Sequence, residues 1–135
     1  MKRKIILIED EEALAYLYVF TLEKEYDIKW VSNTKDAAEL LKTFKADIFL
    51  VDHGMRYGVS GGESLPVFKE LRPDAYFVLF SNYSWPILKD RYDDENGNNV
   101  LELAHECWDK NDVSLETLKI RLKRIEKKFF SEVKN

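Results

Sequence analysis

Cysteine and histidine are both scarce in this chain of 135 residues, which contains one Cys and two His. The single cysteine, Cys107, has no partner for a disulfide within the chain, so a disulfide-stabilised scaffold is excluded. One cysteine and two histidines also exclude a Cys-rich or His-rich zinc site. The lack of disulfides is typical of a reducing compartment, and we expect a cytoplasmic protein.

Long apolar runs are absent as well, since no segment approaches the roughly 18 apolar residues needed to cross a bilayer. The chain opens with basic residues and then Ile5, as a signal peptide does, but Glu9 ends the apolar run. We therefore expect neither a signal peptide nor a membrane anchor. The composition, 45% hydrophobic and 34% charged, is that of one ordinary globular domain.

Positive charge is in deficit overall, because the formal net charge is −4. This argues against electrostatic binding of nucleic acid by the domain as a whole. The charge is uneven, because residues 116–135 contain seven Lys or Arg and three Glu. This basic end is interpreted as a solvated helix face or a surface that docks a protein partner. No helix-turn-helix or other nucleic-acid reader follows it.

Short apolar runs alternate with segments of helical spacing along the chain. The runs at residues 5–8, 28–31, 48–51 and 76–80 predict strands, most of them covered on both faces. Between them, apolar residues recur at helical spacing within residues 14–22, 37–44 and 65–71. A fifth strand around Trp108 and a helix capped by Ser114 complete the pattern. The alternation predicts an α/β protein with a parallel sheet of five βα units.

The stretch at residues 90–99 interrupts this pattern. It contains almost no apolar residue and carries Gly97 among three Asn, so we expect an exposed acidic loop insertion there. Pro86 is expected to open the preceding helix.

Polar residues follow the predicted strands where each strand ends. They are two acids after the first strand, one acid after the third, one hydroxyl after the fourth and one amine after the fifth: Glu9, Asp10, Asp52, Ser81 and Lys110. Any one alone is typical of a helix cap or a loop. Because ligands bind outside the carboxyl ends of parallel strands, the five together predict a functional site.

Three carboxylates packed together raise one another's pKa unless a cation compensates them. Oxygen ligands of this kind favour a hard divalent ion, and Mg²⁺ prefers one or two carboxylates together with a phosphate. Asp52 is then a credible nucleophile toward a phosphoryl group, with Lys110 neutralising charge and Ser81 hydrogen-bonding the transferred group.

These motifs, in their order and spacing, resemble the receiver domains of two-component response regulators over nearly the whole chain. IILIEDEE is similar to the first strand with its acid pair, and ADIFLVDHGM to the third strand with its phosphoacceptor. YFVLFS is similar to the fourth strand with its switch hydroxyl, and CWDKNDVSLETL to the fifth strand with its lysine. The resemblance implies a flavodoxin-like, doubly wound (βα)5 fold with strand order 2-1-3-4-5, covering residues 1–135 without an output domain.

The resemblance also implies a role for each site residue. The implied metal ligands are Glu9, Asp10, Asp52 and the backbone carbonyl of Gly54, with Asp52 as phosphoacceptor, Ser81 as switch hydroxyl and Lys110 as phosphate contact. The chain departs from the family pattern at three positions. Arg56 and Asn111 stand where prolines are usual, and Cys107 stands where an aromatic residue usually moves on activation.

The remaining candidate residues are interpreted as structural. His53 follows Asp52 on a strand, so its side chain is expected to leave in the opposite direction. His105 is expected in a loop or at a helix end, and Cys107 as a small buried apolar residue. Trp30, Trp85 and Trp108 are expected in the core or an interface.

We therefore expect a stand-alone receiver that accepts a phosphoryl group from a histidine kinase or a phosphotransfer protein. It is expected to signal through a protein partner or self-association, by way of the last strand and helix. It is not expected to be an independent enzyme, to bind nucleic acid or to bind a membrane. The alternatives are a phosphorylation-independent interaction module and a Mg²⁺-dependent phosphohydrolase. The Asp-x-Asp pattern of aspartyl phosphatases is absent, because Gly54 occupies its second position.

Overall fold

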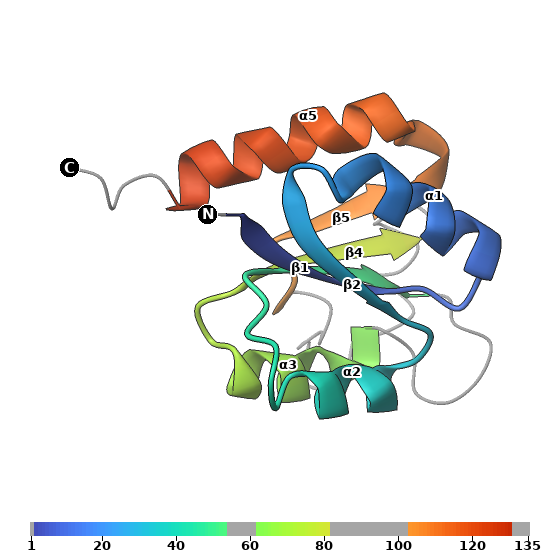
Figure 1. The fold of residues 1–135 in the computed structure, drawn as a ribbon. Helices are drawn as coiled ribbons and strands as arrows, with labels where there is room; N and C mark the ends of the chain where they lie inside the picture. The colour runs from blue at the N-terminus through green and yellow to red at the C-terminus, as the bar shows by residue number, and fades with distance from the viewer. Residues whose placement is uncertain (1, 54–61, 82–102, 131–135) are drawn as a thin grey trace, which may run out of the picture.

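The protein is a three-layer α/β sandwich, seen in a computed structural model that describes residues 2–53, 62–81 and 103–130 (Figure 1). The central layer is a parallel five-stranded sheet with strand order 2-1-3-4-5. Its strands are β1 (Arg3–Ile8), β2 (Tyr26–Val31), β3 (Ile48–Asp52), β4 (Tyr76–Ser81) and β5 (Glu106–Asp109). The predicted flavodoxin-like, doubly wound fold is therefore confirmed.

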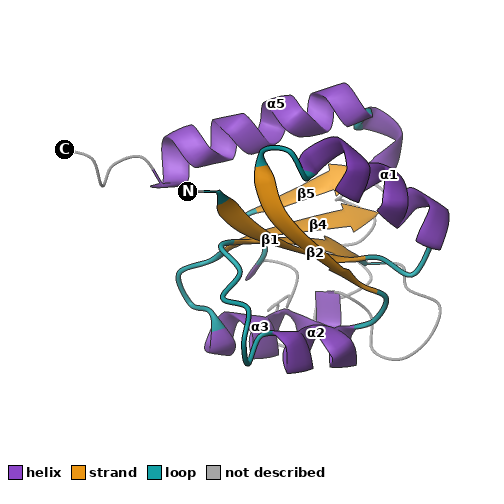
Figure 2. Ribbon diagram, in the orientation of Figure 1, coloured by secondary structure: helices purple, strands orange, loops and turns teal. Residues whose placement is uncertain are grey.

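Helices cover both faces of the sheet (Figure 2). One face carries α1 (Glu12–Leu22) and α5 (Leu115–Ile125), and the other carries α2 (Thr34–Leu40) and α3 (Leu65–Leu71). Shorter helical turns are η1 (Gly62–Ser64), η3 (Lys110–Asp112) and η4 (Glu126–Phe130), the last of which continues α5. Within the described ranges, no helix is long and apolar enough to cross a bilayer.

Side-chain caps define where two helices begin, and the sequence predicts the one at Ser114. The Asn33 side chain accepts a hydrogen bond from the Asp36 backbone N–H at 2.7 Å, and α2 follows. The Ser114 hydroxyl accepts from the Thr117 backbone N–H at 3.1 Å and begins α5. The apolar stripe predicted to reach Phe44 extends beyond α2, because the chain turns after Leu40 and Phe44 packs from that turn.

The sheet forms the core, with alternate residues of each strand on opposite faces. In β1, Ile5 and Leu7 pack beneath α1 and α5, whereas Ile6 and Ile8 pack beneath α2 and α3. All four side chains are fully buried. Burial on both faces explains why these runs are apolar throughout instead of alternating with polar residues.

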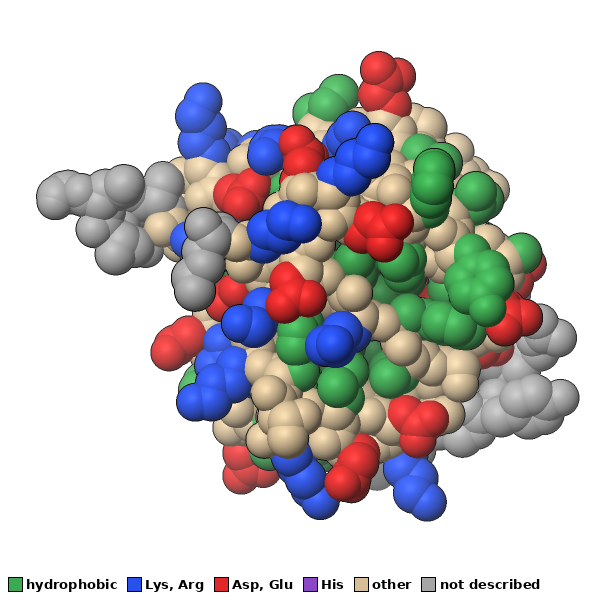
Figure 3. Space-filling view, in the orientation of Figure 1, with side chains coloured by type: hydrophobic (Ala, Val, Ile, Leu, Met, Phe, Trp, Pro, Cys, Tyr) green, Lys and Arg blue, Asp and Glu red, His purple; other side chains and the backbone are tan. Residues whose placement is uncertain are grey.

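The two helices on the α1–α5 face differ in character (Figure 3). Hydrophobic side chains gather over α1, where Tyr16, Leu17 and Phe20 are exposed. Lys and Arg side chains gather over α5, as its basic sequence predicts. Several predictions lie outside the described residues: the helix at Pro86, the core or interface position of Trp85, the loop at residues 90–99 and the positions of Gly54 and Arg56.

Candidate functional site

The carboxyl edge of the sheet collects the polar residues that the sequence singled out. Register pairs Ile8 of β1 with Val51 of β3, so Glu9 and Asp52 both come one residue later at the same edge. Ser81 pairs with Asp109 across β4 and β5, and Lys110 follows directly. Parallel pairing therefore brings four separate stretches of sequence to one edge.

Lys110 connects the two buried carboxylates of this edge. Its Nζ lies 3.1 Å from Glu9 Oε1 and 3.2 Å from Asp52 Oδ1. The Glu9 side chain is 1% exposed and the Asp52 side chain 5% exposed, so both carboxylates lie inside the protein. The other Glu9 carboxylate oxygen, Oε2, accepts the backbone N–H of Glu11 at 3.2 Å.

Asp10 completes a group of three acids. One carboxylate oxygen each from Glu9, Asp10 and Asp52 lies within 4.8 Å of the others. We call Glu9, Asp10, Asp52 and Lys110 the acidic site. Three acids with one lysine leave an excess of negative charge in a largely buried space, which fits a hard divalent cation better than a soft metal.

Burial and neighbouring charges both shift the pKa values in the acidic site. Burial and the neighbouring charge of Asp52 raise the pKa of Glu9 to about 7, although the Lys110 ammonium opposes the shift. Burial disfavours the charged form of Lys110, but the Asp52 and Glu9 carboxylates outweigh it and raise the pKa of Lys110. Lys110 therefore stays cationic, and Glu9 is the acid of the site whose ionised form is disfavoured.

Ser81 is 2% exposed and stands at the end of β4, at the predicted edge. His53 is also buried, and its backbone N–H donates to the Phe80 carbonyl at 2.8 Å. It is not a member of the group of three acids. Gly54, the implied carbonyl ligand, lies outside the described residues.

Three residues interpreted as structural pack against other side chains of the fold: Cys107, Trp108 and His105. Cys107 is half-buried, packs against the core beneath α2 and α3, and has its pKa raised to about 11 by burial, so it stays a thiol. Trp108 is buried on the opposite face of β5 and packs in the core beneath α1 and α5. His105 lies just before β5, where its ring stacks on Tyr76 with ring centroids 4.3 Å apart.

Sequence reasoning missed Tyr18 as a neighbour of the acidic site. Its buried ring stacks on Phe80 of β4 at 5.7 Å. Burial raises the pKa of Tyr18, and the charges of Lys110, Glu9 and Asp52 also act on it. In the sequence, Tyr18 belongs to the apolar stripe of α1. Helical spacing alone does not distinguish an aromatic residue of the core from one that lies beside a functional site.

Solved structures of receiver domains match this fold along nearly the whole chain. A receiver-domain protein from Methanospirillum hungatei, described as CheY-like, matches at a TM-score of 0.78 with 17% identity, over 98% of this chain and 99% of its own. The response regulator TrrA from Thermotoga maritima, solved in complex with Mg²⁺ and BeF, matches at 0.72 with 23% identity, over 91% and 98%.

A third match is a response regulator from Burkholderia pseudomallei that carries a phosphorylated aspartic acid and a calcium ion. It aligns at a TM-score of 0.74 with 18% identity, over 98% of this chain and 74% of its own. No family model matches the chain. The similarity is therefore one of structure, and this protein has the fold of response-regulator receiver domains.

Proposed function

We propose that this protein is a response-regulator receiver that accepts a phosphoryl group on Asp52. The observation that carries the proposal is the acidic site, in which Lys110 bridges Glu9 and Asp52 beside Asp10. The phosphorylated aspartic acid in the Burkholderia protein and the Mg²⁺ in TrrA are consistent with this reading.

Mg²⁺ fits the donor set of the acidic site. The residues that would hold it are Glu9, Asp10 and Asp52, with the Gly54 carbonyl as a further ligand. Three oxygen donors within 4.8 Å of one another suit a hard ion, and the three acids outnumber the one lysine beside them. When bound, Mg²⁺ supplies the charge that neutralises a phosphoryl group and its transition state.

The residues of the chain then act as follows. A carboxylate oxygen of Asp52 attacks the phosphorus of a phosphohistidine, the P–N bond breaks, and the electron pair leaves with the imidazole nitrogen. The product is an acyl phosphate on Asp52. Lys110, already at 3.2 Å from Asp52, donates to a phosphoryl oxygen, and the Ser81 hydroxyl donates to another.

The donor is a histidine kinase or a phosphotransfer protein, and output passes to a protein partner or to a second copy. The protein acts inside the cell as a phosphoacceptor that assists its own phosphorylation, and it is not an independent enzyme. The net charge of −4 argues against nucleic-acid binding by the whole domain. The positive charge is concentrated on α5, and we assign to that surface the docking of a protein partner.

Incubation with acetyl phosphate, with and without Mg²⁺, tests the proposal by intact-mass measurement. We expect one Mg²⁺-dependent, acid-labile phosphoryl adduct, which is lost in Asp52→Asn and kept in Asp112→Asn, a matched change of an exposed acid. Labelling of the Asp52→Asn protein contradicts the assignment of Asp52. Absence of any adduct favours the phosphorylation-independent interaction module, and continuous phosphate release favours a phosphohydrolase.

A further inference from the structure

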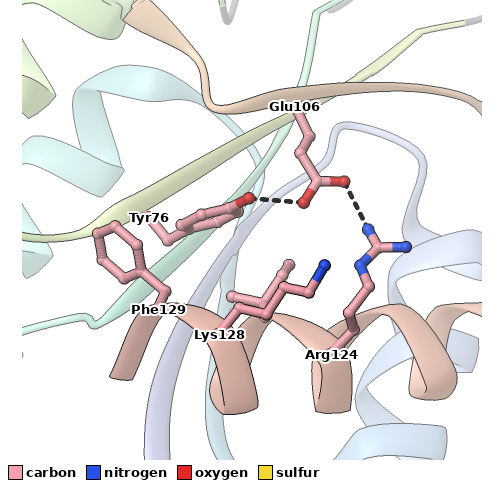
Figure 4. Close-up of a pocket in the computed structure, with 6 residues that line it drawn as sticks. Tyr76, Glu106, Arg124, Lys128 and Phe129 are labelled. Atoms are coloured by element: carbon pink, nitrogen blue, oxygen red, sulfur yellow. Dashed lines mark hydrogen bonds and ion pairs between the residues drawn. The ribbon is translucent and has the colours of Figure 1, made fainter. Parts of the chain in front are cut away.

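A second polar pocket lies at the opposite, amino-terminal end of β4 and β5, beneath the last turns of α5 (Figure 4). It has a volume of about 290 Å³. The residues that line it are Tyr76, Glu106, Arg124, Ile125, Lys128 and Phe129. We call it the Glu106 pocket, and none of its residues belongs to the acidic site.

Glu106 is held at the centre of this pocket by three donors. The Tyr76 hydroxyl donates to Glu106 Oε2 at 2.6 Å. The Trp108 indole N–H and an Arg124 guanidinium N–H donate to Glu106 Oε1 at 2.6 and 2.9 Å. Burial disfavours the charge, but these hydrogen bonds outweigh it and lower the pKa of Glu106. The carboxylate is therefore ionised and accepts three hydrogen bonds.

Lys128 leaves the pocket with a surplus of positive charge. Arg124 balances Glu106 through their ion pair at 2.9 Å. The Lys128 ammonium points into the space between Glu106 and Arg124 in Figure 4, and no ion pair joins it to any residue of the described ranges. The Arg124 guanidinium has five N–H donors, so donors remain beyond the one bound to Glu106. The pocket therefore presents one uncompensated cation.

Aromatic and aliphatic groups form the other wall. The Phe129 ring meets Tyr76 edge to face, with centroids 4.8 Å apart and planes at 69°. The His105 ring stacks on Tyr76 and also meets Phe129 edge to face at 5.2 Å. These contacts hold the Phe129 ring in a fixed position beside Ile125. A planar ring in the pocket would pack against this wall.

We propose that the Glu106 pocket binds a small aromatic monocarboxylate. The ligand carboxylate accepts hydrogen bonds from Lys128 and from the outer N–H groups of Arg124, and its ring packs on Phe129 and Ile125. A monoanion balances the single uncompensated cation, whereas a dianion such as phosphate leaves the pocket with a net negative charge beside Glu106. The volume equals that of about ten water molecules, which is enough for a bicyclic ring with one carboxylate. The proposal does not depend on the function assigned to Asp52.

NMR titration of the full, unphosphorylated chain with indole-3-carboxylate tests the proposal. The Trp108 indole N–H is the reporter, because it donates to Glu106 inside the site. We expect a saturable shift of this signal with a dissociation constant of about 1 mM, as befits a ligand of this size. Indole, which lacks the acid, and tryptamine, which has the opposite charge, are expected to leave the signal unshifted. An equal shift with tryptamine, or no saturable shift with indole-3-carboxylate, overturns the proposal.

A matched pair of lysine variants on the last helical segment locates the binding. Lys128→Gln removes the uncompensated cation and is expected to weaken binding about tenfold, the loss of one charge-assisted hydrogen bond. Lys119→Gln removes an equally exposed charge that does not line the pocket, and is expected to bind as the unmodified chain does. Both side chains are exposed, so both variants fold. A loss in Lys128→Gln no larger than in Lys119→Gln overturns the proposal.

Discussion

The acidic site and the Glu106 pocket are two charged clusters at opposite edges of the same sheet, and their charges are balanced in opposite ways. In the acidic site three carboxylates share one lysine, and the pKa of Glu9 is raised. In the Glu106 pocket one carboxylate receives three donors, and the pKa of Glu106 is lowered. Both clusters are partly or wholly buried, so burial alone does not explain the difference.

The difference indicates what each cluster contributes to the protein. Three donors of the folded chain bind the one Glu106 carboxylate, so this cluster adds stability. Acids that outnumber cations leave an excess of negative charge in the acidic site until a cation binds, so this cluster costs stability and is suited to binding a cation. Four substitutions or additions distinguish these two cases.

Glu106→Gln is expected to give the largest change in stability. The substitution removes the charge that three donors address and turns an amide N–H toward one of them, which should lower the free energy of unfolding by about 2 kcal/mol. Urea unfolding measures this, with the exposed Glu70→Gln as the control. A loss equal to that of Glu70→Gln would show that the Glu106 cluster is not stabilising.

Adding Mg²⁺ is expected to stabilise the protein through the acidic site. At ten times the dissociation constant, preferential binding to the folded state raises the free energy of unfolding by about 1.4 kcal/mol. Thermal melts with and without Mg²⁺ measure it. Asp10→Asn should reduce the effect and Asp112→Asn should keep it, and a melt insensitive to millimolar Mg²⁺ contradicts the assigned metal ligands.

Glu9→Gln is expected to stabilise the Mg²⁺-free protein at pH 8, in contrast to Glu106→Gln. Because the pKa of Glu9 is raised, the folded state favours its protonated form, and the ionised form opposes folding at pH 8. Removing that charge should raise the free energy of unfolding by about 1 kcal/mol, after allowing for the lost hydrogen bond from Lys110. Chemical unfolding with EDTA present checks the sign. Destabilisation would mean that the Lys110 contact outweighs the repulsion.

His105 is expected to give the smallest effect, a dependence of stability on pH beside the Glu106 pocket. Its Nδ1 accepts the Phe77 backbone N–H at 3.0 Å, which requires the unprotonated ring. Burial and the nearby Lys69 lower the pKa of His105, while Glu106 opposes them. The folded state therefore binds this proton more weakly than the unfolded chain, and stability falls as the pH drops through about 6.5.

The measurement compares His105 with His105→Asn, which keeps an acceptor for Phe77 but does not titrate. Between pH 7.5 and 5.5, roughly spanning the unfolded pKa, the unmodified chain should lose about 0.5 kcal/mol more than the variant, a figure kept small because His105 is exposed. Equal pH profiles for the two proteins would show that the Phe77 contact does not restrict protonation of His105.

In the described part of the chain, the sequence by itself determined the strands, their alternation with helices and the edge where the acidic site forms. Strands covered on both faces appear as continuous apolar runs, as in β1 and β3, and caps such as Ser114 are set by local hydrogen bonds. A residue that directly follows a parallel strand must lie at the carboxyl edge, so Glu9, Asp52 and Lys110 could be brought together from their positions alone.

Tertiary structure alone decided which side chains meet. Glu106 contacts Tyr76 across 30 residues and Arg124 across 18, and no periodicity or motif predicts those pairs. Tyr18 of α1 likewise lies beside the acidic site because its ring stacks on Phe80 of β4. Sequence patterns record the face on which a residue lies, because that depends on a local repeat of 2 or 3.6 residues. The partner on the neighbouring element depends on sheet twist, register and helix packing, which form only when the whole chain is folded.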